Sequence, residues 1–141
     1  GYIDSGFEEG ARAATGGAAG DGLGFFVKPT VLVDVRDDMK VVREEIFGPV
    51  VVALPYEDLD EVARRANDTP YGLAASIWSN DLSRVHRLIP KIKAGTVWVN
   101  CHNMLDSAMP FGGYKQSGIG REMGRAVIDL YTESKSVVMM L

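Results

Sequence analysis

The stretch VVVALP at residues 50–55 opens the part of the chain that decides its fold. Two further apolar stretches follow it, LAASIW at 73–78 and TVWVN at 96–100, and each has the length of a buried strand. Between them, at about 58–67 and 81–93, apolar residues recur at helical spacing. Strands that alternate with helices predict a βαβαβ unit with parallel strands. We therefore expect an α/β fold.

Each of the two predicted helices has one apolar face that would cover the sheet. These faces are formed by Leu59, Val62, Ala63 and Ala66 in the first helix and by Leu82, Val85, Leu88, Ile89 and Ile92 in the second. Turn-forming residues at 67–72 and 93–95 end the helices before the next strand. Pro90 would kink or interrupt the second helix, because proline has no backbone N–H to donate.

Apolar residues at helical spacing also predict a helix at the start of the chain, with no cap residue before it. These residues are Ile3, Phe7, Ala11 and Ala14. Five glycines follow within residues 16–24, and an extended run covers 25–33. A phosphate-binding loop would need a strand before the glycines and a helix after them, so we interpret them as a flexible connection into a strand. The same missing pattern argues against a self-sufficient Rossmann-like nucleotide binder.

The last third of the chain predicts a long loop at 101–117, a helix near 118–131 and an apolar tail at 135–141, KSVVMML. The continuous apolar character of the tail indicates a strand that is buried on both faces. No hairpin turn joins it to an earlier strand. We therefore expect it to pair with another sheet, in a neighbouring subunit, and a frayed end is the alternative.

Composition limits the classes of function. The chain has 141 residues, of which 46% are hydrophobic, and a net charge of −4. This length suits one domain or a piece of one. An acidic balance without basic clusters disfavours nucleic acid, and no apolar run is long enough to span a membrane or to form a signal peptide. We expect a soluble, cytoplasmic protein.

Metal chemistry is also disfavoured by the sequence. A single cysteine, Cys101, and two isolated histidines, His86 and His102, offer no metal-ligand spacing. We therefore predict that no metal is bound.

Residues 44–50, EEIFGPV, place an acidic pair, one aromatic residue and a Gly-Pro turn directly before the first strand of the βαβαβ pattern. Glu45 and Phe47 would then be displayed in a loop at a sheet edge, where binding residues often lie. Alternatively, Glu45 is a solvated charge, Phe47 anchors the core and the Gly-Pro pair is only a turn. The motif by itself does not separate these interpretations.

Three further segments extend the pattern: NDTPYGLAA at 67–75, AGTVWVN at 94–100 and PFGGYKQSGIGRE at 110–122. Together with residues 44–50, in this order and spacing, they resemble the C-terminal part of NAD(P)-dependent aldehyde dehydrogenases. The resemblance covers essentially the whole chain. It implies a parallel-sheet portion of the α/β catalytic domain at 1–131, followed by a C-terminal oligomerisation strand at 132–141. It also implies a homodimer or homotetramer.

The resemblance assigns roles to four residues. Glu45 would accept hydrogen bonds from the ribose hydroxyls on the nicotinamide side of NAD, and Phe47 would pack beside the nicotinamide. NADP is not excluded, because the adenosine-ribose contacts of the family lie outside this sequence. Phe111 would border the substrate tunnel, and Leu105 would lie in the variable loop 102–105 that shapes its mouth.

The catalytic residues of the family have no counterpart in this sequence. Its nucleophilic cysteine, general-base glutamate and oxyanion-hole asparagine lie upstream of the segment that matches residue 1. We interpret Cys101 as a small structural residue and Asn100 as a brace that hydrogen-bonds loop backbone. Glu122 matches a family carboxylate near the water path, and a structural salt bridge with Arg121 or Lys115 is the alternative.

The loop after residue 100 favours an apolar aldehyde over an anionic one, because it is rich in apolar side chains and has one acid. These residues are Met104, Leu105, Asp106, Met109 and Phe111. The segment 101–106 most resembles that of phenylacetaldehyde dehydrogenases. Betaine aldehyde dehydrogenases are the nearest competitor, but the loop has few rings for a quaternary ammonium.

We therefore expect a piece of an oxidoreductase that oxidises such an aldehyde to the carboxylic acid with NAD(P). The chain starts at Gly1 without a methionine, as we would expect of a fragment. We expect it to be inactive alone, because the nucleophilic cysteine of the family has no counterpart in it. The second hypothesis is a noncatalytic folding or assembly piece.

Overall fold

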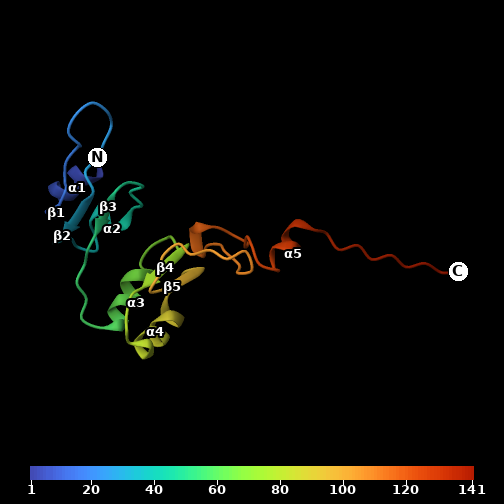
Figure 1. Cartoon of the computed structure of the whole chain (residues 1–141). Coiled ribbons are helices and arrows are strands. Elements are labelled where there is room, and N and C mark those ends of the chain that lie inside the picture. The colour runs from blue at the N-terminus through green and yellow to red at the C-terminus, as the bar shows by residue number, and fades with distance from the viewer. The chain divides into compact units, whose positions relative to one another are not determined.

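The computed structural model describes all residues from 1 to 141, and the chain forms two compact units, Gly1–Glu57 and Asp58–Leu141 (Figure 1). No helix in either unit is both long enough and apolar enough to cross a membrane.

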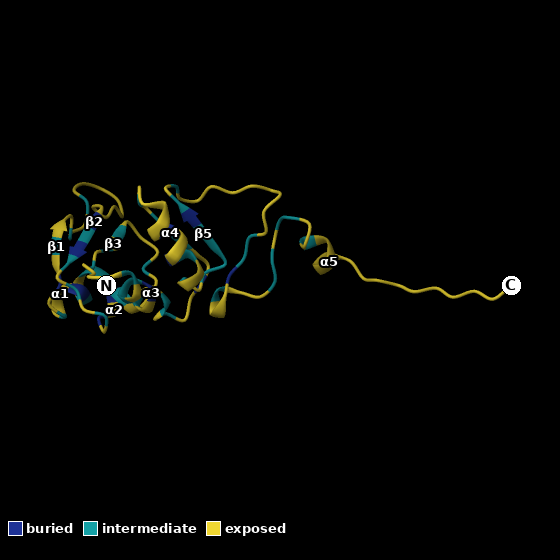
Figure 2. Cartoon of the chain, turned by 90° about the horizontal axis from the view of Figure 1, so that it is seen from below, coloured by how far each residue is buried: buried dark blue, intermediate teal, exposed yellow.

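The first unit is a three-stranded sheet with two helices. Its elements are α1 (Tyr2–Glu8), β1 (Arg12–Thr15), β2 (Thr30–Val33), α2 (Lys40–Arg43) and β3 (Val50–Val52). The central strand, β2, pairs antiparallel with β1 and parallel with β3. Leu32 of β2 is fully buried and packs with the core residues Ala11, Met39 and Val41. Figure 2 shows this buried part of β2 in dark blue.

The second unit contains a βαβ element. Its helices and strands are α3 (Leu59–Asn67), β4 (Ala74–Ile77), α4 (Leu82–Leu88), the 3-10 turn η1 (Ile89–Lys91), β5 (Thr96–Val99), the 3-10 turn η2 (Lys115–Ser117) and α5 (Val127–Tyr131). Strands β4 and β5 are parallel, with Ser76 opposite Trp98. This parallel pair and the helix between its strands confirm the sequence prediction for residues 73–100. The first strand of the predicted βαβαβ unit, at 50–55, is instead β3 in the sheet of the first unit, so the prediction of one three-stranded unit is wrong.

Local capping explains where α3 and α4 begin. The carboxylate of Asp58 accepts hydrogen bonds from the backbone N–H groups of Asp60 and Glu61, and that of Asp81 accepts one from Arg84. Such caps satisfy backbone donors that have no partner within the first turn of a helix. At the other end of α4, Pro90 lies in η1, so the predicted interruption of this helix is confirmed.

The prediction of an all-parallel sheet is wrong in the first unit. The predicted opening helix ends at Glu8, because Gly10 has a φ of 100° and closes the helix. The residues that follow form β1, antiparallel to β2. The predicted run at 25–33 is a strand only from Thr30.

The predicted helix at 118–131 is much shorter than expected. Only Val127–Tyr131 is helical. Gly118, Gly120, Met123 and Gly124 all have positive φ angles, which a right-handed helix does not accommodate. The conformational freedom of the glycines therefore prevails over the apolar spacing of this segment.

The predicted strand at the C-terminus does not form within this chain. Residues 132–141 have no regular secondary structure and are exposed, as Figure 2 shows by their colour. A strand needs a partner for its backbone hydrogen bonds, and none of the strands β1 to β5 pairs with this segment. The pairing of the tail with another subunit stays a prediction.

Candidate functional site

The loop between α2 and β3 displays two of the predicted site residues. Glu45 is exposed, and 91% of the surface of Phe47 is accessible. The interpretation of Phe47 as a core anchor is therefore wrong. Its φ of 50° lies in the left-handed region, which costs an ordinary residue roughly 1 kcal/mol. The loop thus holds an aromatic ring in solvent in a strained conformation.

Both ends of this loop are anchored. At its start, the carboxylate of Glu44 accepts a hydrogen bond from the hydroxyl of Tyr2 at 2.8 Å. At its end, the carbonyl oxygen of Pro49 accepts one from the N–H of Thr30 at 2.8 Å. Hydrogen bonds at both ends of the loop therefore hold the segment that exposes Glu45 and Phe47.

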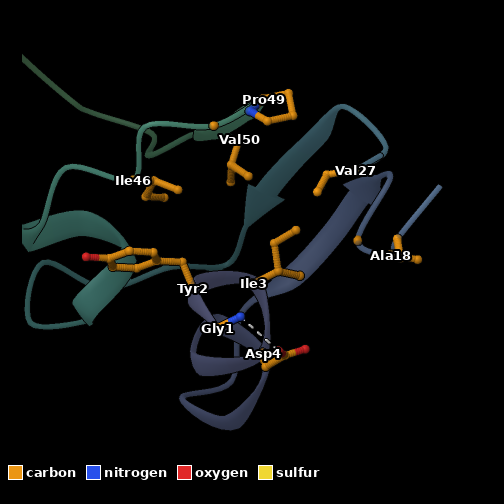
Figure 3. A pocket seen from close by; sticks show the side chains of 12 residues that line it. Gly1, Tyr2, Ile3, Asp4, Ala18, Val27, Ile46, Pro49 and Val50 are labelled. Atoms are coloured by element: carbon orange, nitrogen blue, oxygen red, sulfur yellow. Dashed lines mark hydrogen bonds and ion pairs between the residues drawn. The ribbon is translucent and has the colours of Figure 1, made fainter. Parts of the chain in front are cut away.

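A cavity of about 370 Å³ adjoins the same loop (Figure 3). Tyr2 and Ile3 of α1 line it together with Ile46, Pro49 and Val50. Its walls are mainly apolar, and the carboxylate of Asp4 is the one charged side chain among the lining residues. Glu45 and Phe47 are not among the lining residues.

In the second unit, the loop after β5 is tied to neighbouring backbone at its first residue. The side chain of Asn100 accepts a hydrogen bond from the N–H of Ser79 at 2.8 Å and donates one to its carbonyl oxygen at 3.0 Å. Asn100 has a φ of 54°, a conformation that asparagine tolerates better than most residues. Its predicted role as a loop brace is confirmed. Cys101 follows as a half-buried free thiol.

The two predicted substrate-side residues differ in their surroundings. Leu105 is half exposed, at 50% of its surface, and the side chains of Met104 and Met109 near it are more exposed still. Phe111 is partly buried and pairs with Glu122 through two backbone hydrogen bonds of 2.7 Å. It also lines a cavity of about 230 Å³ with Leu73 and Arg121. Leu105 thus lies in the middle of a largely exposed loop, and Phe111 lies at the end of this loop.

Glycines let the family-like segments of the second unit approach each other closely. The N–H of Gly72 donates to the hydroxyl of Ser117 at 2.9 Å, and its carbonyl oxygen accepts from the N–H groups of Gly95 and Tyr114 at 3.0 and 2.8 Å. A Cβ on Gly95 would lie 1.7 Å from the carbonyl oxygen of Gly112. Residues that lie far apart in the sequence are therefore joined backbone to backbone.

Two side chains complete this connection at the end of α3. The ammonium group of Lys115 donates to the carbonyl oxygens of Asn67 and Thr69 at 2.8 and 2.9 Å. The amide of Asn67 bonds the carbonyl oxygen of Lys91 and the N–H of Lys93, each at 2.7 Å. These polar contacts stabilise the scaffold that supports the loop after β5.

Glu122 makes neither of the salt bridges considered from the sequence. Lys115 bonds carbonyl oxygens instead, and Arg121 donates to those of Gly113 and Gly120. The hydroxyl of Tyr131 donates to the carboxylate of Glu122 at 2.6 Å. This hydrogen bond raises the pKa of Tyr131 above its ordinary value of 10.0, because it stabilises the protonated phenol next to a negative charge.

The structure brings Glu45 together with Phe47 in one loop of the first unit, and Leu105 together with Phe111 in one loop of the second unit. The sequence reasoning missed the hydrogen bonds that Ser76, Trp98 and Lys115 make with His102, Met104 and Thr69, respectively. The spacing of residues in the sequence does not predict such contacts. Ser76 and His102, for example, are 26 positions apart, and Lys115 and Asn67 are 48 positions apart.

A comparison with known families decides the assignment of this scaffold. The model of the aldehyde dehydrogenase family matches residues 1–137. The chain belongs to the aldehyde dehydrogenase family. Its mixed α/β architecture is the aldehyde dehydrogenase fold.

Individual aldehyde dehydrogenases are similar over nearly the whole chain. One from Bacillus cereus, solved as an NAD⁺ complex, is 56% identical with a TM-score of 0.91 over 96% of this chain and 28% of its own. DhaS of Bacillus subtilis, a protein assigned as an aldehyde dehydrogenase, is 55% identical over 96% of this chain and 28% of its own length. The betaine aldehyde dehydrogenase of Brucella anthropi is 51% identical over 96% and 29%, respectively. This chain therefore spans less than a third of the length of these aldehyde dehydrogenases.

Proposed function

We propose that this chain is the C-terminal part of an NAD-dependent aldehyde dehydrogenase that oxidises an apolar or aryl aldehyde, such as phenylacetaldehyde, to the carboxylic acid. Glu45 and Phe47 form the cofactor edge, and Leu105 and Phe111 form the substrate edge. The observation that carries the proposal is the display of an exposed Phe47 ring beside an exposed carboxylate, in a loop anchored at both ends.

The displayed residues fit the nicotinamide side of a dinucleotide. The carboxylate of Glu45 only accepts hydrogen bonds, which suits the two hydroxyls of a ribose. The ring of Phe47 offers a flat apolar wall that limits the positions of a planar ring beside it. When bound, NAD supplies the acceptor for the hydride of the aldehyde. These two residues orient the cofactor and need no acid or base chemistry of their own.

The loop after β5 favours an apolar aldehyde. Met104, Leu105 and Met109 present apolar side chains at the surface, and Phe111 ends the loop as its aromatic residue. A phosphorylated or anionic aldehyde would call for basic groups, and residues 101–111 contain no lysine or arginine.

A betaine aldehyde is the second candidate, and sequence similarity favours it. Betaine aldehyde dehydrogenases of Brucella anthropi and Brucella melitensis are 51% and 52% identical to this chain. A quaternary ammonium group is usually bound by several aromatic faces, and residues 101–111 contain only two aromatic rings, those of His102 and Phe111. The ratio of kcat/KM for phenylacetaldehyde and betaine aldehyde separates the two candidates.

Assembly is part of the proposal. We propose that residues 132–141 pair with a sheet of another subunit in a homodimer or homotetramer. Five apolar residues at the end of this segment are exposed: Val137, Val138, Met139, Met140 and Leu141. Burial of such a run stabilises an interface, while exposure favours aggregation.

The first experiment compares the purified chain with the full-length enzyme, measuring NADH formation from phenylacetaldehyde and NAD. We expect activity in the full-length enzyme only, with circular dichroism showing that the chain is folded. Activity in the chain alone would contradict the expectation that the nucleophile lies elsewhere. Cys101→Ser would then separate catalysis by this thiol from a contaminant.

The role of Glu45 is tested in the full-length enzyme by Glu45→Gln. We expect the single-turnover rate of hydride transfer to fall about tenfold, because the cofactor ribose is held less firmly. Glu8→Gln, which removes the same charge from an exposed position on α1, is the matched control. An unchanged rate in Glu45→Gln would refute the cofactor role.

A further inference from the structure

A polar contact links β4 to the loop after β5. The hydroxyl oxygen of Ser76 lies 2.8 Å from Nδ1 of His102, although the two residues are 26 positions apart. Ser76 is partly buried on β4, while His102 is exposed. The register of the parallel pair places Ser76 opposite Trp98 on β5, so all three side chains gather at one place in the sheet.

Trp98 contacts both His102 and the loop backbone. The imidazole of His102 meets the ring of Trp98 edge to face, with 5.3 Å between the centroids. Trp98 is buried, and its indole N–H donates to the carbonyl oxygen of Met104 at 2.7 Å. The hydrogen bond from Trp98 therefore ties Met104, the neighbour of Leu105, to a buried ring that the imidazole of His102 contacts.

The loop has few other interactions at this point. The side chains of Met104 and Leu105 are exposed, and Asn103 before them has a φ of 56°, which most residues avoid. Such a segment would sample several conformations if the anchor at Trp98 were weakened. The hydrogen bond from Trp98 to Met104 therefore limits the positions that the side chain of Leu105 can adopt.

We propose that Ser76 and His102 are positioning residues that set the selectivity of the enzyme for large over small aldehydes, by fixing the loop segment Met104–Leu105 through Trp98. This inference rests on the proposed function, in which Leu105 lies at the substrate edge. In that function, a bulky aryl aldehyde would extend to this segment, whereas acetaldehyde would be too short to contact it. The two residues therefore act on the KM for large aldehydes and not on the cofactor side.

The test is a set of variants of the full-length enzyme with two aldehydes. Ser76→Ala should raise the KM for phenylacetaldehyde relative to that for acetaldehyde about fivefold, the effect of losing one neutral hydrogen bond. Its kcat for acetaldehyde and its KM for NAD should stay unchanged. Ser76→Thr keeps the hydroxyl and should restore the ratio, and Ser83→Ala on the exposed face of α4 is the matched control.

Two further variants test the coupling. His102→Phe keeps a ring against Trp98 but loses the hydrogen bond, so it should change the ratio as Ser76→Ala does. The double variant should add nothing, because both changes remove one interaction. In the isolated chain, the indole N–H of Trp98 should exchange with solvent faster in Ser76→Ala than in Ser83→Ala.

The outcomes separate this inference from the proposed function. An unchanged KM ratio in Ser76→Ala, or equal indole exchange in Ser76→Ala and Ser83→Ala, would overturn the inference alone. Failure of the unmodified full-length enzyme to oxidise either aldehyde would overturn the proposed function, and with it the selectivity role.

Discussion

At the scale of single residues, Phe47 and Asn100 both have a left-handed backbone conformation, but their side chains have different surroundings. Phe47 turns its ring to solvent, whereas Asn100 uses its amide to bond the backbone of Ser79 twice. Backbone strain often gathers at positions where a loop must present a group in one orientation. For Phe47 this favours display of the ring, and for Asn100 it favours a rigid start of the loop after β5.

Asn100→Ala should destabilise the second unit by about 2 kcal/mol, because it removes two hydrogen bonds and leaves alanine at a positive φ. Asn100→Gly should cost less, since glycine adopts this backbone freely. Both tryptophans, Trp78 and Trp98, lie in the second unit, so tryptophan fluorescence during urea unfolding reports on this unit. Asn80→Ala, an exposed amide in the same unit, is the control, and an equal effect of both alanine variants would contradict the prediction.

At the scale of elements, local sequence predicted the helices that begin with aspartate caps and the strands that flank them. It failed where glycine decides the backbone, as in the segment from Gly118 to Gly124, which shortens α5. Apolar spacing alone does not reveal whether a glycine will adopt a positive φ. That choice depends on contacts such as the pairing of Phe111 with Glu122.

Gly95→Ala should destabilise the second unit by more than about 3 kcal/mol, because the new methyl group would overlap the carbonyl oxygen of Gly112 and force the backbones apart. Gly118→Ala is the matched comparison. It has open space around its Cβ position but a φ of 137°, so about 1 kcal/mol of strain is expected. Urea unfolding followed by tryptophan fluorescence measures both, and equal costs would refute the close-contact argument.

The contact between α5 and Glu122 should depend on pH. The raised pKa of Tyr131 means that its hydrogen bond to Glu122 contributes fully below pH 10.0, the ordinary pKa of tyrosine, and is lost as the pH rises through the folded-state pKa. Titration of the phenolate absorbance, with Tyr131→Phe used to identify its signal, measures this pKa. Glu122→Gln should lower it, and no change in that variant would contradict the assigned cause.

At the scale of the whole molecule, the chain exposes many large apolar side chains. The apolar residues of the tail and Phe47 are exposed, as are Leu23 and Phe25 in the glycine-rich segment. The chain also matches less than a third of the length of its relatives. We expect such surface to drive association with other protein.

Self-association should depend on the apolar tail. The double variant Val138→Asp/Met140→Asp places charges in the exposed apolar run and should shift the sedimentation profile of the chain toward the monomer. Ser136→Asp adds charge to the same tail outside that run and should leave the profile nearly unchanged. Identical profiles for the unmodified chain and the double variant would rule out the tail as the contact.

The sequence by itself determined the parallel β4–α4–β5 element, the interruption at Pro90 and the family, because these depend on periodicity, caps and motifs that are local in the chain. It also identified Asn100 as a brace and pointed to Glu45 and Phe47 as a displayed pair. Only the tertiary structure decided that β1 is an antiparallel strand and that Glu122 bonds Tyr131. It alone joined Ser76 to His102 and Trp98 to Met104. These contacts depend on which backbones approach each other, and local side-chain pattern does not specify that approach.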